Sequence, residues 1–302
     1  MRHLLGIDGL SANDITSLLD EATRYAHPHD PIVTRGVLRG KTILNVFYES
    51  STRTRTSFEL AGKRLGADVV NIAASSSSVT KGETLLDTVK NLEAMGSDGI
   101  VLRHAHSGAP HFVAQHTRAS IVNAGDGSHE HPTQALLDAF TIRQRLGKLD
   151  GLVVVICGDI LHSRVARSNS LLLGALGSEV RLCGPRTMMP RDPTVLGPTV
   201  RVFDRFDDAI EGADVVMMLR IQNERLAGAV MATTREYART FGLNERRLRL
   251  AKPEALVMHP GPINRGVELD NAVADGARSV ILDQVEAGVA VRCAVLAKVL
   301  LH

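Results

Sequence analysis

Two kinds of segment alternate along the chain. Short apolar runs rich in Val and Ile predict buried strands, and longer segments with apolar positions at helical spacing predict helices. The predicted strands cover residues 42–48, 68–72, 99–103, 120–123, 152–157, 179–182, 200–203, 214–219 and 255–258. The predicted helices cover residues 54–65, 84–95, 133–146, 163–176 and 284–301. Apolar strands that alternate with helices are typical of parallel βαβ units.

The order of these elements predicts an α/β fold of two doubly wound parallel-sheet domains linked by helices. We place the first domain at residues 1–132 and the second at residues 133–285, and we expect the final helix, about 286–302, to pack back on the first domain. Pro132 suits the first turn of the linking helix. Ligands of doubly wound sheets bind outside the carboxyl ends of the strands, so the polar residues that follow each strand are the candidate site residues.

The composition is typical of a soluble globular protein with two domains. The chain has 302 residues, 44% of them hydrophobic, and no apolar run approaches the ~20 residues needed to cross a membrane. The N-terminal residues lack the apolar stretch of a signal peptide, so we expect a cytoplasmic protein. Cys157, Cys183 and Cys293 are interpreted as buried free thiols. The net charge of +2 gives no reason to expect nucleic acid or membrane partners.

Residues 47–59 combine hydroxyl side chains with arginines between a predicted strand and a predicted helix. Backbone N–H groups and the positive end of the dipole make a helix N-terminus suitable for an anion. Arg53 and Arg55 add guanidinium groups, each able to hold two phosphate oxygens. The alternative is a capped helix start with solvated arginines, but it does not explain so many hydroxyls. The segment therefore predicts a phosphate-binding loop.

The same loop contains Ser-Thr-Arg-Thr-Arg from Ser51 to Arg55, which resembles the hallmark of the transcarbamylase family. Six further motifs of that family follow in the family's order along nearly the whole chain. They are Lys81-Gly82-Glu83-Thr84, Val101-Leu102-Arg103-His104, His131-Pro132-Thr133-Gln134, Gly158-Asp159 to Arg164, Arg220-Ile221-Gln222 and His259-Pro260-Gly261-Pro262. The resemblance implies an enzyme of pyrimidine synthesis that transfers the carbamoyl group of carbamoyl phosphate to L-aspartate.

The resemblance also implies roles on the carbamoyl phosphate side. Arg103 binds phosphate and carbonyl, His131 donates to the carbamoyl oxygen, and Gln134 accepts from the carbamoyl amide. The residues implied to bind carbamoyl phosphate are Ser51, Thr52, Arg53, Thr54, Arg103, His131, Gln134, Gly261 and Pro262. Without the resemblance, Arg103 would be interpreted as solvated and His131 as a helix cap. A zinc site at His129 and His131 is disfavoured because no third ligand of suitable spacing follows.

Carbamoyl transfer needs fixed hydrogen-bond donors and no covalent intermediate on the enzyme. Attack of an amine on the carbamoyl carbon places negative charge on the carbonyl oxygen, which Thr54, Arg103 and His131 would stabilise. The leaving phosphate, held by Arg53, is a candidate acceptor for the amine proton. The catalytic residues implied are Arg53, Thr54, Arg103, His131 and Lys81, with no cofactor and no metal.

L-Aspartate brings two carboxylates, so its site needs several cationic groups. The residues implied to bind it are Lys81, Arg164, Arg220 and Gln222. Arg167 lies one turn from Arg164, and its role stays open. An ornithine-type transcarbamylase is the alternative, but it needs an acidic partner for the side-chain amine and a His-Cys-Leu-Pro stretch. His259-Pro260-Gly261-Pro262 contains no cysteine, and Arg220 is out of place in a site for an amine, so aspartate is favoured.

Matching residues of the family imply that Ser77 and Lys81 reach into the active site of the adjacent subunit of a homotrimer. Without the resemblance, these two residues would be interpreted as part of a solvated loop. The sequence leaves three assemblies open: the trimer alone, the trimer with regulatory chains, and the trimer joined to dihydroorotase.

Two other functional classes remain to be weighed. A nicotinamide-dependent oxidoreductase would carry Gly-x-Gly-x-x-Gly after a strand, whereas Gly158 is followed by Asp159-Ile160-Leu161-His162, so this class is disfavoured. A non-catalytic homologue that acts as a structural partner of dihydroorotase would have lost site residues. Every phosphate, carbonyl and carboxylate position is filled by a competent side chain, so we expect catalytic activity.

Overall fold

The computed structural model describes residues 1–26, 36–73, 82–221 and 233–301. The chain divides into two compact units, one of Met1–Leu137 with Glu286–His302 and one of Asp138–Val285. The division falls inside two helices, α6 (Pro132–Leu146) and α12 (Ile281–Leu300). Each unit contains one parallel sheet with flanking helices, so the predicted fold class is confirmed.

The first unit is built on a four-stranded parallel sheet with the strand order β2-β1-β3-β4. Its strands are β1 (Thr42–Phe47), β2 (Asp68–Ala73), β3 (Gly99–His104) and β4 (Ser120–Asp126). β1 lies between β2 and β3, so the segments that follow β1 and β3 leave the sheet at neighbouring positions on its carboxyl edge. The pairing thus brings together residues that lie 56 positions apart in the sequence, such as Phe47 and Arg103.

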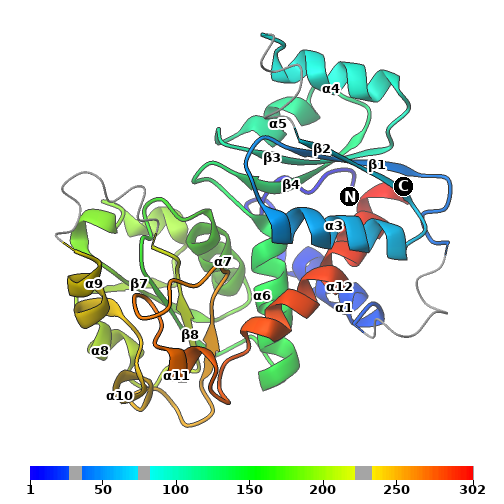
Figure 1. The fold of residues 1–302 in the computed structure, drawn as a ribbon. Coiled ribbons are helices and arrows are strands. Elements are labelled where there is room, and N and C mark those ends of the chain that lie inside the picture. Colours follow the sequence, from blue (N-terminus) through cyan, green and yellow to red (C-terminus); the bar gives the residue numbers. More distant parts are fainter. Residues whose placement is uncertain (27–35, 74–81, 222–232, 302) are drawn as a thin grey trace. The chain divides into compact units, whose positions relative to one another are not determined.

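Helices cover both faces of this sheet (Figure 1). They are α1 (Ala12–Arg24), α3 (Thr52–Arg64), α4 (Leu85–Ala94) and α5 (Ala109–Ala114), together with the last part of α12. α4 and α5 contribute Val89 and Val113 to a core with Leu44 and Leu102 on one face. α3 packs closely on the other face, where a Cβ on Gly62 would lie 2.5 Å from Val69 Cγ2. Alternate residues of each strand therefore serve two separate cores.

The second unit contains a five-stranded parallel sheet with the strand order β7-β6-β5-β8-β9. Its strands are β5 (Val153–Cys157), β6 (Glu179–Cys183), β7 (Val200–Phe203), β8 (Val215–Met218) and β9 (Leu256–Met258). β6 and β7 are added on one side of β5, and β8 and β9 on the other, so the strand order switches between β5 and β8. Ligands of doubly wound sheets bind at such a switch point.

One face of the second sheet packs on α7 (Arg164–Ala175), and the other packs on a group of short helices (Figure 1). These are α8 (Phe206–Ile210), α9 (Thr234–Phe241), α10 (Glu245–Leu248) and α11 (Asn271–Ala274). Phe206, Tyr237 and Leu248 from this group join one core with Val155 and Val216 of the sheet. Two short 3-10 helices, η3 (Arg186–Met188) and η4 (Pro193–Leu196), connect β6 to β7.

Helix α1 is an addition to the predicted elements, although the sequence contains two signals for it. Ile15, Leu18, Leu19 and Ala22 are buried and recur at the spacing of one helix face. Ser11 and the residue at the third helical position form a capping box, with both reciprocal hydrogen bonds present. The short helices α5, α8, α9, α10 and α11 were also not predicted, because four to eight residues are too few to show a clear helical period.

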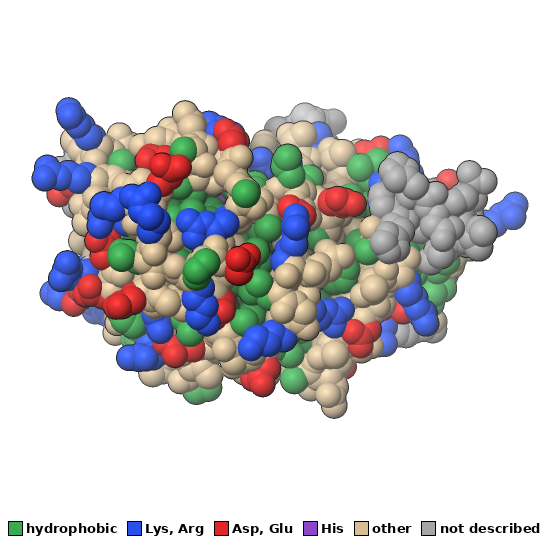
Figure 2. Space-filling view, turned by 90° about the horizontal axis from the view of Figure 1, so that it is seen from below, with side chains coloured by type: hydrophobic (Ala, Val, Ile, Leu, Met, Phe, Trp, Pro, Cys, Tyr) green, Lys and Arg blue, Asp and Glu red, His purple; other side chains and the backbone are tan. Residues whose placement is uncertain are grey.

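The three cysteines are buried and free, as predicted. Burial raises the pKa of the Cys293 thiol to about 12, so this thiol stays protonated and unreactive at neutral pH. Across the described ranges, no helix combines the length and the apolar character needed to cross a bilayer. On the face shown in Figure 2, positive and negative side chains are interspersed, in keeping with the small net charge.

Candidate active site

The predicted phosphate loop lies between β1 and α3. Ser51 occupies the N-cap position of α3 with extended backbone, and within the described structure its side chain makes no capping hydrogen bond. The first turn contains no acidic residue. Thr54 is 8% exposed, whereas Thr52 and Arg53 are exposed. This turn therefore presents backbone N–H groups and the positive end of the dipole to an anion, with no carboxylate of its own in competition.

Arg103 lies beside this loop because β1 and β3 are paired. Phe47 is in register with Arg103, and the Tyr48 N–H donates to the Arg103 carbonyl at 2.9 Å. The Arg103 side chain is only 12% exposed, and its Nε lies 3.4 Å from Oε2 of Glu49. Its Nη1 donates to the Ala124 carbonyl at 3.1 Å. These two contacts orient the guanidinium at the carboxyl edge of the sheet.

His131 and Gln134 follow β4 and begin α6. His131 is 4% exposed and Gln134 is 9% exposed. The His131 carbonyl accepts from the Gln134 N–H at 3.0 Å, so the backbone of His131 closes the first turn of the helix. The predicted phosphate loop, Arg103 and His131 thus follow the ends of β1, β3 and β4, which are neighbours in one sheet.

In the second unit, Arg164 is the first residue of α7, just after β5. Ser163 caps this helix, and its Oγ accepts from the Ala166 N–H at 3.0 Å. Gly158 has a φ of 143°, and a Cβ at this position would lie 2.7 Å from the Leu219 Cβ. Glycine is therefore required where the chain leaves β5 close to the end of β8.

Arg220 and Gly261 follow β8 and β9, which are paired strands. Asn264 Nδ2 donates to the Ile221 carbonyl at 2.8 Å and ties the two loops together. Gly261 has a φ of 67°, a conformation that favours glycine, and the peptide bond to Pro262 is cis. The ends of β5, β8 and β9 thus place Arg164, Arg220 and the Gly261–Pro262 turn along one edge of the second sheet.

A buried hydrogen-bond network supports the turn at Gly261. The side chains of His259 and Glu268 are fully buried, and His259 Nε2 lies 3.2 Å from Glu268 Oε1. The Gly261 N–H donates to His259 Nδ1 at 2.8 Å, so Nδ1 carries the lone pair and Nε2 carries the proton that Glu268 accepts. The same carboxylate oxygen accepts from the Asn264 N–H at 2.6 Å. Sequence reasoning missed Glu268, because no motif links it to a histidine nine positions earlier.

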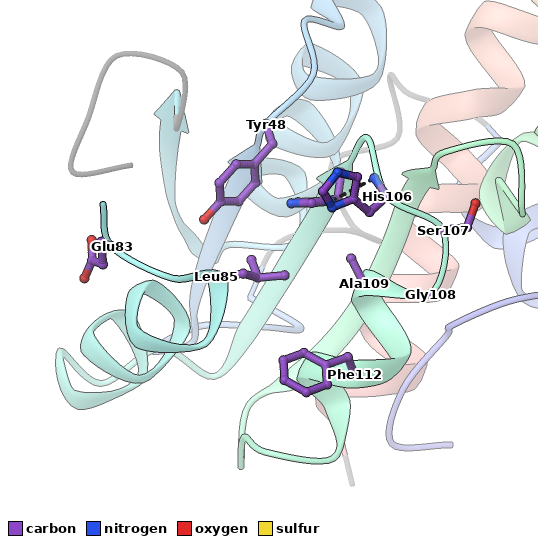
Figure 3. A pocket seen from close by; sticks show the side chains of 9 residues that line it. Tyr48, Glu83, Leu85, His106, Ser107, Gly108, Ala109 and Phe112 are labelled. Atoms are coloured by element: carbon purple, nitrogen blue, oxygen red, sulfur yellow. Dashed lines mark hydrogen bonds between the residues drawn. The ribbon is translucent and has the colours of Figure 1, made fainter. Parts of the chain in front are cut away.

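A cavity of about 490 Å³ lies near the carboxyl ends of β1 and β3, and Figure 3 shows its lining. Tyr48 and His104 form part of it, with ring centroids 4.8 Å apart. Burial, followed by the neighbouring His106, lowers the pKa of the His104 imidazole. α4 and α5 supply Leu85 and Phe112 to the lining. The predicted site residues that the structure describes are absent from its lining, so the cavity is next to the predicted phosphate loop and distinct from it.

Three of the predicted site residues, Ser77, Lys81 and Gln222, lie outside the described residues. The remaining ones fall into two groups, one at the carboxyl edge of each sheet. The group in the first unit suits a phosphorylated ligand, because it combines a helix N-terminus with arginine. Arg164 and Arg220 in the second unit suit carboxylates.

Two family models match the chain. The model for the carbamoyl-P binding domain of aspartate/ornithine carbamoyltransferase matches residues 2–144, and the model for the Asp/Orn binding domain matches residues 150–299. The chain therefore belongs to the aspartate/ornithine carbamoyltransferase family. The family resemblance drawn from the sequence motifs is confirmed.

Individual relatives separate the two branches of the family. The aspartate carbamoyltransferase catalytic subunit of Sorangium cellulosum (strain So ce56) is 67% identical, over 98% of this chain and 92% of the relative. The structure of aspartate transcarbamoylase from Trypanosoma cruzi with carbamoyl phosphate and aspartate has a TM-score of 0.88 at 32% identity, covering 99% of this chain and 97% of that one. Ornithine carbamoyltransferase from Pyrococcus furiosus has a TM-score of 0.89 at 28% identity, with the same coverage. The fold is thus common to both activities, and only the sequence distinguishes them.

Proposed function

We propose that this chain is the catalytic chain of an aspartate carbamoyltransferase. It transfers the carbamoyl group of carbamoyl phosphate to L-aspartate, giving N-carbamoyl-L-aspartate and phosphate in the de novo synthesis of UMP. The observation that carries this proposal is the 67% identity with an aspartate carbamoyltransferase catalytic subunit along 98% of the chain. Further relatives at 57–60% identity have the same name. The ornithine-type alternative is therefore set aside.

The first unit holds carbamoyl phosphate. The N-terminus of α3, with Ser51, Thr52, Arg53 and Thr54, binds the phosphate, and Arg103 bridges phosphate and carbonyl oxygens. Two observations on the described residues support this assignment. The first turn of α3 has no side-chain cap and no acidic residue, and two contacts orient the Arg103 guanidinium. His131 donates to the carbamoyl oxygen and Gln134 accepts from the carbamoyl amide. Both side chains are nearly buried, and hydrogen bonds to the ligand are stronger where water is excluded.

The reaction needs only this chain's own groups and the two substrates. The aspartate amine attacks the carbamoyl carbon, the bond from that carbon to the phosphate oxygen breaks, and the amine proton passes to the leaving phosphate. Negative charge that builds on the carbonyl oxygen is stabilised by Thr54, Arg103 and His131. Removal of one such fixed donor typically costs about 3–4 kcal/mol, or a hundredfold or more in rate.

The second unit holds L-aspartate. Arg164 and Arg220 bind its two carboxylates, with Gln222 and Lys81 completing the set. The placement of both arginines after β5 and β8 supports this assignment, because the two strands are paired. The Gly261–Pro262 turn presents backbone carbonyls to the ligand amines. We accordingly assign residues 1–132 as the carbamoyl phosphate domain and residues 133–285 as the aspartate domain, with the end of α12 belonging to the first. Ser120 Oγ donates to the Val299 carbonyl at 2.7 Å, in support of that last point.

An assay with two competing acceptors tests the proposal. The purified chain is given carbamoyl phosphate with L-aspartate and L-ornithine together, and both carbamoylated products are quantified. We expect N-carbamoyl-L-aspartate as the main product and a loss of about a hundredfold or more in the Arg103→Ala variant. Arg220→Ala should raise KM for aspartate by about tenfold to a hundredfold, since one hydrogen-bonded ion pair is lost. Arg186→Ala, which removes an exposed partner of Asp204, is the control. Carbamoylation of ornithine, or full activity of Arg103→Ala, would overturn the proposal.

The active site is shared across a homotrimer in this proposal, with Ser77 and Lys81 supplied by the adjacent subunit. Subunit exchange tests this point. Inactive Lys81→Gln and Arg53→Ala proteins are mixed under conditions that allow exchange, and mixed trimers should contain some sites with all native groups. Recovery of activity in the mixture, but in neither protein alone, is expected. A mixture that stays inactive although mass spectrometry shows mixed trimers would contradict sharing.

The enzyme is expected to act in the cytoplasm, where carbamoyl phosphate and aspartate are consumed for pyrimidines. Assembly beyond the trimer, with regulatory chains or with dihydroorotase, is left to measurement of the native mass in cell extract.

A further inference from the structure

Three potential metal ligands meet at the end of β4, outside the groups assigned to carbamoyl transfer. His111 comes from α5, Asp126 is the last residue of β4, and His129 lies in the turn that leads to α6. One ligand atom from each residue lies within 4.8 Å of the other two. His111 and His129 are eighteen positions apart in the sequence, so the sheet and α5 have to fold before the three side chains can meet.

The separation of two of the ligand atoms suits a tetrahedral metal ion. His129 Nδ1 lies 3.1 Å from Asp126 Oδ2. Zinc bonds to imidazole nitrogen and carboxylate oxygen of about 2.0–2.2 Å place two ligands about 3.3–3.6 Å apart at the tetrahedral angle. A metal ion would therefore need little movement of either side chain. It would replace the proton that these two atoms otherwise share.

His111 has an unused buried nitrogen. Its Nδ1 is inaccessible to solvent and has no hydrogen-bond partner among the described residues. The His111 ring stands edge-on to the His129 ring, with centroids 5.5 Å apart. Buried polar atoms in native proteins nearly always have a partner, so an orphaned one calls for an explanation. Coordination of a metal ion would supply that partner.

The carboxylate of Asp126 is held in position by backbone N–H groups and by the Asn123 side chain. The side chain is fully buried, and Oδ2 accepts from the Gly108 N–H at 2.7 Å. Oδ1 accepts from Asn123 Nδ2 at 2.8 Å and from the Glu130 N–H at 3.1 Å. Hydrogen bonds of this kind fix the orientation of a ligand and raise the affinity of metal sites.

We propose that His111, Asp126 and His129 form a binding site for a divalent transition metal ion, with Zn²⁺ as the first candidate. Two imidazoles and one carboxylate suit zinc and its neighbours, whereas Mg²⁺ and Ca²⁺ prefer oxygen ligands alone. A water molecule takes the fourth position. The bound ion ties α5 to the turn that precedes His131, and so stabilises that turn. The sequence-based prediction of no metal concerned a site at His129 and His131. Only His129 of that pair belongs to the cluster, and the other two ligands come from α5 and the end of β4.

Cobalt spectroscopy tests the site on the full-length protein without reference to activity. Protein stripped with a chelator is titrated with Co²⁺, whose visible absorption reports four-coordinate nitrogen and oxygen ligation, and Zn²⁺ is then added in competition. We expect one Co²⁺ per chain, displaced by Zn²⁺. Loss of an outer-shell partner costs about 10–100-fold in metal affinity, so His111→Ala and His129→Ala, which each remove a ligand, should cost at least about tenfold.

Two exposed histidines near the cluster, His106 and His116, serve as matched controls. His116→Ala removes an exposed histidine after α5 whose ring contacts the Phe112 carbonyl and ring. His106→Ala removes an exposed histidine whose ring lies 5.0 Å from that of His104. Both variants should bind Co²⁺ as the parent protein does. His111→Gln provides a second substitution that keeps a polar side chain in case the alanine variant unfolds.

Thermal unfolding gives an independent measurement. A ligand that binds only the folded state raises the unfolding midpoint, so Zn²⁺ should raise it in the parent protein and in His116→Ala but not in His111→Gln. Absence of the Co²⁺ spectrum in the parent protein would overturn the proposal and leave a hydrogen-bonded His129–Asp126 pair. Equal Co²⁺ affinity in His111→Gln and the parent protein would also overturn it.

Discussion

Helices α1 and α3 lie in the same unit, each has 13 residues, and each has a serine at its N-cap position. In α1, Ser11 Oγ accepts from the Asp14 N–H at 3.1 Å, and the Asp14 carboxylate accepts from the Ser11 N–H at 3.1 Å. In α3, the Ser51 side chain makes no capping hydrogen bond in the described structure. The first turn of α1 contains an acidic residue and that of α3 contains none.

The difference shows two uses of the same helix end. A capping side chain is worth about 1 kcal/mol, and an acidic residue in the first turn adds about 0.3–1 kcal/mol. α1 has both contributions, so its N-terminus stabilises the fold. α3 has neither, and it carries Arg53 and Thr54 in their place. Its N-terminus is therefore suited to an external anion, at a cost to the stability of the free protein.

The largest effect is expected from Arg53→Ala, which removes the permanent charge from the first turn of α3. Turnover should fall by about a hundredfold or more, because the phosphate loses a partner that is also engaged in the transition state. Steady-state kinetics of carbamoyl-aspartate formation measure this. The matched control is Arg24→Ala at the end of α1, whose guanidinium pairs with Glu21 at 3.0 Å. Near-normal turnover of Arg53→Ala would contradict the view that the N-terminus of α3 binds the phosphate.

A smaller effect is expected from Ser51→Asp, which adds a carboxylate at the N-terminus of α3, where α1 has Asp14. The new side chain should stabilise the helix by up to about 1 kcal/mol, yet it should raise KM for carbamoyl phosphate at least about tenfold through repulsion of the phosphate. Ser51→Ala separates the loss of the hydroxyl from the added charge and should weaken binding less. Chemical denaturation and kinetics on the same preparations provide both values. An aspartate variant with unchanged KM would show that the anion binds elsewhere.

The smallest effect is expected from Ser11→Ala, which removes the cap of α1. The free energy of unfolding should fall by about 1 kcal/mol, and activity should be unchanged because α1 has no part in the proposed reaction. Ser51→Ala should leave the free energy of unfolding almost unaltered, since its side chain makes no capping bond. Urea denaturation of the two variants side by side measures the contrast. Equal destabilisation by both substitutions would contradict it.

Most strands were predicted to within one or two residues, because buried parallel strands are continuous apolar runs. β4 is the exception, since it extends to Asp126 rather than ending at residue 123. Gly125-Asp126-Gly127 resembles a turn in sequence, yet a shift of register between Leu102 and His104 on β3 lets the pairing continue to Asp126. Local turn propensity was overridden by pairing with a strand that lies more than twenty residues earlier.

The candidate site was predictable where its residues are contiguous. The composition of the loop from Ser51 to Thr54 by itself predicts an anion site. Arg103 and Arg164 were predicted as site residues only through the motifs of the family, because an isolated arginine at a strand end or helix start would be interpreted as solvated. Glu268 and His111 were not identified. One supports the Gly261 turn through His259, and the other meets Asp126 and His129, and both relationships arise between separate elements.

The sequence by itself determined most of the strands, the family and the choice of aspartate over ornithine, and it predicted the loop that we propose binds phosphate, because each depends on local patterns or on motifs within short segments. Only the tertiary structure decided which side chains meet. The placement of β1 beside β3 sets Arg103 against Glu49, the pairing of β8 with β9 ties Asn264 to Ile221, and the packing of α5 beside β4 sets His111 near Asp126. These contacts depend on the order of strands and the packing of helices, which are fixed by the burial of apolar surface over the whole unit and not by any short segment.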